Sequence, residues 1–159
     1  MTKQPGAPDN RLLAMLPASF RRPLMERMQV VTMKVHHPVY DDQTDIRHVY
    51  FPIQGVVSLL ATMNDGSAVE VGTVGNEGMA GLPAFLGASR TPGRAFQQIA
   101  GSAYRLDVPA LRELTPAGSP FTQLLHRYTQ AFFVQVSQAT ACNRLHPAEE
   151  RLARWLLMC

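Results

Sequence analysis

The sequence predicts an α+β fold in which a roll or sandwich of short antiparallel strands is followed by a long helix. Turn signals rich in glycine, proline, asparagine and aspartate recur roughly every eight to twelve residues in the first two thirds of the chain, which favours a roll or sandwich over a parallel sheet. From Phe121 onward, apolar residues recur at alternating steps of four and three, the spacing of one helical stripe. At 159 residues the chain has the size of one domain and can bury a core without disulfide bonds.

Two short helices are predicted ahead of the strands. Residues 1–9 are polar and contain two prolines, so we expect this segment to be disordered. Asn10 has the side chain of a helix N-cap, and a short helix through Leu16 follows it. A second helix is predicted over residues 17–28. We expect Pro23 to break it near its middle, because proline cannot donate the helical hydrogen bond.

The strands are predicted from alternating or β-branched runs. Pro52 is expected to close one of them, because proline has no N–H to donate to a sheet. Residues 64–67, Asn-Asp-Gly-Ser, have the composition of a tight turn, since Asx and glycine tolerate a positive φ, so the flanking strands form a hairpin. The predicted strands are 31–35, 47–51, 55–63, 68–74, 94–100 and 103–108.

The remaining third of the chain is predicted to be helical, beginning with a short helix over residues 109–114. Ser119 and Pro120 then supply the N-cap and first-turn proline of a long helix over 119–145. Pro147 starts a new helix, whose first turn holds two glutamates that complement the helix dipole. The apolar stripe of the long helix consists of Phe121, Leu125, Tyr128, Phe132, Gln135, Ala139 and Cys142.

The stripe of the long helix allows two interpretations. It is typical of a coiled-coil seam of about three heptads, which would pair two copies of the chain. It also fits a helix that packs only on the strands of its own chain. Leu124, Phe133, Val134 and Val136 lie outside the stripe, so one face can pack on the strands while another meets a second copy.

Charge and composition exclude several classes of protein. Net charge is +3, yet residues 35–89 contain six carboxylates and one arginine, so this acidic middle is not a surface for nucleic-acid phosphates. The basic ends are most simply solvated helix faces. The longest apolar runs fall far short of the ~18 residues of a membrane span. The N-terminus lacks the apolar core of a signal peptide, so we expect a cytoplasmic protein.

An enzyme has little support in the sequence. It contains neither a GxSxG elbow nor a Walker-type phosphate loop. His37, Asp45 and His48 could ligate a divalent metal in a cupin-like enzyme, although the usual spacing of two histidines separated by one residue and followed by a glutamate is absent. We therefore expect these side chains to be surface and loop residues, with no catalytic residue, no metal and no cofactor.

The motif order HVYFPxxGVVSLL, then DGxxVEVGxVGxEGMxGLxxFLG, resembles the sensor domain of the Crp/Fnr family of bacterial transcription regulators, and the similarity continues over residues 10–158. The resemblance implies a cyclic-nucleotide-binding-like double-stranded β-roll over 10–118 and a dimerisation helix over 119–145. Residues 146–159 would begin a linker to a helix-turn-helix unit, and we expect the chain to stop inside that helix. DNA and RNA polymerase would be partners only through that unit. Two cysteines are too few for an iron–sulfur cluster.

The resemblance also locates a candidate ligand pocket. In nucleotide-binding members, a Gly-Glu pair opens a short helix, and a following arginine holds the cyclic phosphate. The matching glycine is Gly81 and the matching arginine is Arg94, but Leu82 replaces the glutamate and Ala95 replaces a serine or threonine; Pro83 follows in the same segment. Two of the family's four contacts are therefore missing, and we do not expect cyclic AMP to bind by the usual contacts; another effector, or regulation by abundance alone, fits as well. A cyclic-nucleotide-like or another small effector stays open, and Arg94 could instead pair with an acidic residue of the roll.

We therefore expect the sensory and dimerising part of a Crp/Fnr-like regulator that acts as a homodimer. The alternatives are a free-standing ligand-binding or interaction module without DNA binding, and the cupin-like metal enzyme.

Overall fold

Two long antiparallel strands, β3 (His48–Thr62) and β5 (Gly93–Asp107), run through the whole fold. The computed structural model describes residues 9–158, so residues 1–8 of the segment predicted to be disordered, and Cys159, lie outside the described residues. The sheet has the order β1–β5–β3–β4, with β2 also paired to β5 and every pairing antiparallel. The shorter strands are β1 (Gln29–Met33), β2 (Pro38–Tyr40) and β4 (Ala68–Val74).

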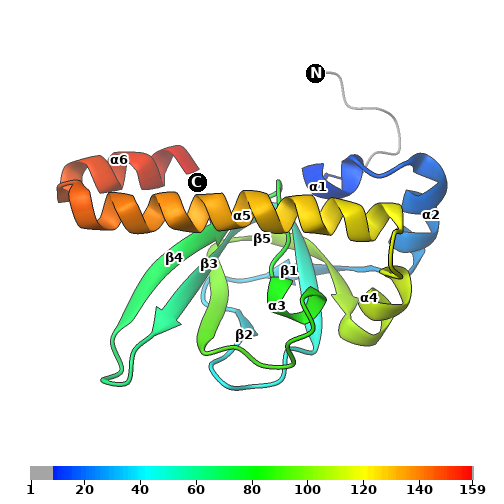
Figure 1. The fold of residues 1–159 in the computed structure, drawn as a ribbon, viewed down its shortest axis with the longest axis horizontal. Helices are drawn as coiled ribbons and strands as arrows, with labels where there is room; N and C mark the ends of the chain where they lie inside the picture. Colours follow the sequence, from blue (N-terminus) through cyan, green and yellow to red (C-terminus); the bar gives the residue numbers. More distant parts are fainter. Residues whose placement is uncertain (1–8, 159) are drawn as a thin grey trace.

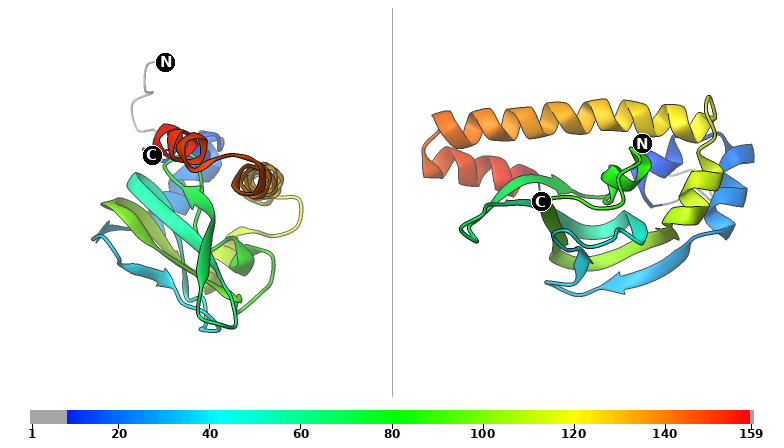
Figure 2. Two further views of the ribbon diagram at one scale, coloured as in Figure 1. Left: turned by 90° about the vertical axis from the view of Figure 1, so that its left-hand side faces the viewer. Right: turned by 60° about the horizontal axis from the view of Figure 1, so that its bottom comes forward.

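The helices flank this curled sheet, which confirms the expected fold class of a β-roll with a long C-terminal helix (Figure 1). Helix α5 runs along one side of the roll, with α2 and α4 near its beginning and α6 near its end (Figure 2). No helix within residues 9–158 has the length and apolarity needed to cross a membrane. The helices are α1 (Arg11–Ala14), α2 (Ala18–Glu26), α3 (Leu82–Phe85), α4 (Val108–Leu114), α5 (Pro120–Leu145) and α6 (Ala148–Met158).

Asn10 begins α1 as predicted and also ties this helix to the roll. Its side-chain oxygen accepts a hydrogen bond from the N–H of Leu13 at 3.0 Å. Its amide nitrogen donates to the carbonyl oxygens of Pro52 and Gly78, each at 2.9 Å. The side chain is fully buried, and these three hydrogen bonds compensate for the loss of water around its polar atoms.

The beginnings of α4 and α5 are fixed in the same local way. The Asp107 carboxylate accepts from the N–H of Ala110 at 2.7 Å and caps α4. The Ser119 hydroxyl accepts from the N–H of Thr122 at 3.1 Å, which confirms the predicted cap of α5. Side-chain oxygens at these positions satisfy amide groups that have no partner inside the helix.

The predicted hairpin is also confirmed. Gly66 has a φ of +85°, which an L side chain rarely adopts, and the N–H of Met63 donates to the carbonyl of Ser67 at 2.8 Å. The Asp65 carboxylate accepts from the N–H and hydroxyl of Ser67 at 2.9 and 2.6 Å and lies in an exposed loop. These bonds close the turn between β3 and β4.

Three predicted breaks are wrong. Pro52 lies inside β3, opposite Ala103, and β5 continues through residues 100–103. Proline is accommodated there because the β3–β5 register is irregular just after it. Pro23 also lies inside an unbroken α2, where the fully buried Leu24 anchors the helix and offsets the one lost hydrogen bond.

The two long strands bend together where two glycines face each other. A Cβ atom on Gly101 would lie 2.0 Å from the carbonyl oxygen of Gln54. Gly55 has a φ of +80°, and a Cβ atom there would lie 2.3 Å from the carbonyl oxygen of Ile99. Glycine at both positions lets the two paired backbones approach closely where they bend. The four strands predicted from the sequence are therefore two long, bent strands.

Replacing Gly101 with alanine is expected to destabilise the protein by ~2 kcal/mol or more, because the new methyl group meets backbone that cannot move aside. Gly66→Ala is the control: nothing lies within 4 Å of its Cβ position, so only the positive-φ strain of roughly 1 kcal/mol remains. Urea unfolding measures both. An equal loss in the free energy of unfolding in the two variants would show that the backbones of β3 and β5 are not in close contact at Gly101.

Candidate ligand pocket

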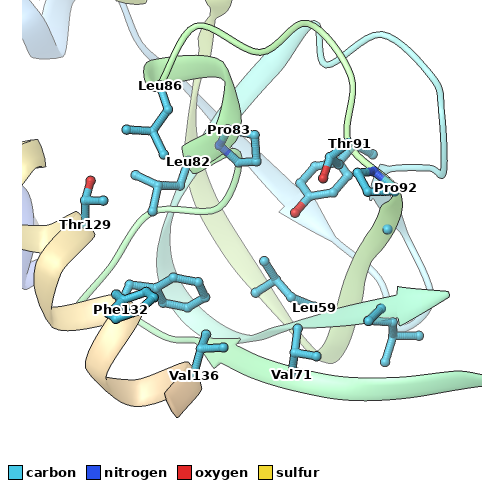
Figure 3. Close-up of a pocket in the computed structure, with 15 residues that line it drawn as sticks. Leu59, Val71, Leu82, Pro83, Leu86, Thr91, Pro92, Thr129, Phe132 and Val136 are labelled. Atoms are coloured by element: carbon cyan, nitrogen blue, oxygen red, sulfur yellow. The ribbon is translucent and has the colours of Figure 1, made fainter. Parts of the chain in front are cut away.

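An apolar cavity of about 370 Å³ lies between α3, the strands and α5. Leu82, Pro83 and Leu86 line it from α3 and the residue after it, as Figure 3 shows. Phe132 and Val136 line it from α5. Leu59 of β3, Val71 of β4 and the loop residues Thr91 and Pro92 complete its walls. A ligand held there would contact the roll and the long helix at once.

Among the residues that the structure describes, no charged side chain lines this cavity, and its polar side chains are those of Tyr40, Thr91 and Thr129. The Thr129 hydroxyl already donates to the carbonyl oxygen of Leu125 at 2.8 Å. Tyr40 is 8% exposed, and its hydroxyl makes no hydrogen bond within the described part of the chain. Burial raises the pKa of Tyr40 to about 12, so the phenol is protonated at neutral pH and is available as a donor.

Gly81 positions α3 against β3. It has a φ of +98° and is the N-cap of α3, and a Cβ atom on it would lie 2.9 Å from Cγ1 of Val49. The preceding residue, Ala80, exchanges two backbone hydrogen bonds with Tyr50, of 2.8 and 2.9 Å. This close contact turns Leu82 and Pro83 toward the cavity, so three of the five predicted pocket residues lie at or beside it.

Arg94 and Ala95, the other two predicted residues, line a neighbouring cavity of about 390 Å³. Arg94 is exposed, whereas Ala95 is 1% exposed, because successive residues of a strand point to opposite faces of the sheet. Within residues 9–158 the Arg94 guanidinium has neither an ion pair nor a hydrogen bond. The two cavities adjoin at Tyr40 and Leu60, and Arg94 lies beside the cavity that Leu82 lines without lining it.

Helix α5 docks on the roll through glycine-sized gaps. The Tyr128 hydroxyl donates to the carbonyl oxygen of Met79 at 3.1 Å, and a Cβ atom on Gly78 would lie 2.4 Å from that hydroxyl. Phe132 lies against Gly72 of β4, whose Cβ would be 3.2 Å from the ring. Burial raises the pKa of Tyr128 well above its usual range, so the phenol remains a donor.

The predicted dimer stripe packs largely on its own chain. Phe121 and Leu125 are fully buried, and Phe121 lies 6.2 and 6.4 Å, between ring centroids, from Phe51 and Phe20. Ala139 and Cys142 are also buried, and the Gln135 amide donates to the carbonyl of Thr73 at 2.8 Å. Within the chain these side chains pack as the second interpretation expects, and pairing of two copies through this stripe stays a prediction.

A second stripe of α5 is exposed and also has steps of three and four. Val134 and Leu145 on it are 48% and 74% exposed. Sequence reasoning missed it because its apolar members are few and small and alternate with polar residues. The stripe consists of Arg127, Ala131, Val134, Gln138, Ala141 and Leu145.

An ion pair holds the loop beside the apolar cavity. Nε of Arg90 lies 2.7 Å from Oδ1 of Asp45, and the Arg90 guanidinium lowers the pKa of that carboxyl below its usual value. The N–H of Gln43 donates to the carbonyl of Thr91 at 3.1 Å, which fixes the same loop. Asp45 is thereby engaged with an arginine, and within residues 9–158 no three His, Cys, Asp or Glu side chains are placed to hold a metal.

Sequence reasoning missed Tyr40, Thr129 and the α5 residues that wall the cavity. The only local signal was the polar aromatic ending of the Pro-Val-Tyr strand, which does not say which way its ring turns.

No protein-family model matches the sequence, and no curated protein matches it either. Solved structures do. The c-di-GMP-responsive global regulator CLP of Xanthomonas campestris superposes with a TM-score of 0.70 and 13% identity over 88% of this chain and 70% of that one. FixK2 of Bradyrhizobium japonicum superposes with a TM-score of 0.69 and 16% sequence identity, over 82% of this chain and 65% of that one. The N-terminal domain of a Streptomyces coelicolor transcriptional regulator superposes with a TM-score of 0.60 and 18% sequence identity, over 82% of this chain and 92% of that one.

This chain spans about two thirds of the length of the first two of these structures. Its structural neighbours include these Crp/Fnr-type transcription regulators and also regulatory subunits of a cAMP-independent protein kinase A from Trypanosoma brucei, and the chain has the cyclic-nucleotide-binding-like fold that they share.

Proposed function

We propose that this chain is the sensory and dimerising part of a Crp/Fnr-like transcription regulator. The observation that carries the proposal is the open cavity lined by α3, the roll and α5, in a fold shared with regulators. A ligand there touches Thr129, Phe132 and Val136, which lie on the helix that leads toward the C-terminus. A ligand that fits one position of α5 better than another shifts the population of that position.

The regulator proposal is tested on the gene's own full product in its native organism. The product is tagged at its chromosomal locus, cross-linked to DNA and immunoprecipitated. We expect discrete enriched regions that share a two-fold symmetric sequence, since dimeric regulators bind paired half-sites. No enrichment over an untagged strain would contradict the proposal and favour a free-standing ligand-binding module.

The homodimer is proposed to form through the exposed stripe of α5. Val134 lies at its centre, with Ala141 one heptad further and Leu145 beyond it. Two-fold symmetry makes each of these residues count twice in the interface. The stripe leaves the buried face of α5 free to hold the roll.

Val134→Asp is expected to convert the dimer to a monomer while the fold is kept, because two carboxylates would face each other across an apolar seam. Thr140→Asp is the matched control, as Thr140 is exposed on α5 but outside the stripe. Sedimentation velocity gives the mass, and circular dichroism reports the fold. A wild-type monomer at high concentration, or a dimeric Val134→Asp, would refute this seam.

Cyclic AMP is expected not to bind with the affinity of a dedicated sensor. The cavity offers its phosphate no cation, and Leu82 leaves the ribose hydroxyls unpaired at roughly 1–3 kcal/mol each when buried, a loss of at least about one power of ten in affinity. Titration calorimetry should show no binding below millimolar concentration. Low-micromolar binding that Arg94→Ala abolishes would overturn this expectation.

Restoring the carboxylate is expected not to restore nucleotide binding. Leu82 is 7% exposed, so Leu82→Glu buries a charge without a partner and should lower the free energy of unfolding by roughly 2 kcal/mol or more. Leu82→Met keeps the volume and should cost less than about 1.5 kcal/mol. Urea unfolding and calorimetry with cyclic AMP test both variants. Micromolar affinity in the glutamate variant would show that Arg94 can reach the cavity.

A further inference from the structure

We propose that the apolar cavity binds a compact, uncharged and mainly apolar molecule that carries one hydrogen-bond acceptor, to which the Tyr40 hydroxyl donates. This inference rests on the proposed sensor function for its biological purpose. The binding chemistry itself rests on the walls of the cavity (Figure 3).

The first step is the exclusion of charged ligands. At about 370 Å³ the cavity falls within the range of roughly 300–1,000 Å³ that is usual for small-molecule sites. None of its lining side chains carries a charge, so a carboxylate or phosphate would lose its hydration without gaining a partner. Arg94, a nearby cation, lines the neighbouring cavity. An ionised ligand therefore binds in this cavity more weakly than its neutral counterpart.

The second step is the choice of the donor. The Thr129 hydroxyl already donates to the carbonyl oxygen of Leu125. Thr91 is only half-buried and lies in the loop before β5. Tyr40 is more than nine-tenths buried, and its hydroxyl has no hydrogen-bond partner among the described residues. The ring of Tyr40 is buried while its hydroxyl is free of protein partners within residues 9–158, so the hydroxyl can donate to a ligand that enters the cavity. Tyr40 thus favours a carbonyl or ether oxygen over a hydrocarbon.

The third step concerns ligand shape. Tyr40 and Phe132 contribute aromatic rings to the walls, and Phe133, which is 66% exposed, lines the cavity as a third. Aromatic walls favour flat rings in offset or edge-to-face contact. A monocyclic or bicyclic ring with one carbonyl group has both the shape and the single acceptor.

Three probes of nearly equal size separate the effects of charge and of the hydrogen-bond acceptor: acetophenone, ethylbenzene and benzoate. Each is titrated into the full chain, and amide chemical shifts locate the binding. We expect saturable shifts at Leu82, Phe132 and Val136 with acetophenone. Ethylbenzene lacks the acceptor but is the more hydrophobic probe, so the hydrogen bond to Tyr40 is measured by how far removal of its hydroxyl changes the ratio of the two affinities; benzoate should bind weakest.

Tyr40→Phe keeps the ring and is expected to weaken acetophenone about threefold to tenfold relative to ethylbenzene. Val136→Trp fills the cavity and should weaken both probes, which shows that the shifts arise there. Benzoate binding as tightly as acetophenone, an unchanged ratio in Tyr40→Phe, or no acetophenone binding at millimolar concentration would each overturn the inference. A chain that enriches DNA in cells but binds no probe refutes this inference alone. One that binds the probes but enriches no DNA refutes the regulator proposal alone.

Discussion

The contact of α5 with glycine backbone is the constraint on which the rest of the structure depends. Tyr128 lies over Gly78 and Phe132 over Gly72, where a Cβ atom would come within 2.4 and 3.2 Å of the aromatic side chain, so a larger residue would force the ring to shift. The helix therefore lies directly on β4 and on the segment that leads into α3. Both the closure of the core and the existence of the apolar cavity follow from this one approach, because α5 forms one wall of each.

The same approach explains why the cavity differs from a nucleotide site. Its walls come from α3, β3, β4 and α5, with Tyr40 of β2 and residues 91–93, and nearly all of these side chains are apolar. Leu82 continues this apolar lining where a nucleotide sensor would place a carboxylate. Arg94 lies on β5 between the buried residues Gly93 and Ala95. Its charged side chain therefore points to the exposed face of the strand.

Features set by neighbouring residues could be predicted from the sequence. The Asn10 and Ser119 caps and the turn at 64–67 depend on hydrogen bonds within a few residues. The continuity of β3 and β5 could not be predicted, because it depends on Gly55 and Gly101 meeting across the sheet. The periodicity of α5 likewise identified an apolar stripe, but nothing in a single chain says whether such a stripe faces its own roll or a second copy.

The uniform chemistry of the cavity walls has a consequence for substitutions in them. Exchanges among leucine, valine, methionine and phenylalanine at positions such as Leu59, Val71 or Leu86 change the shape of the space and cost little stability when total volume is kept. A larger residue at the glycines under α5 would instead force Tyr128 or Phe132 to shift. Single substitutions in the walls can therefore reshape the cavity while the packing of α5 on the roll is kept.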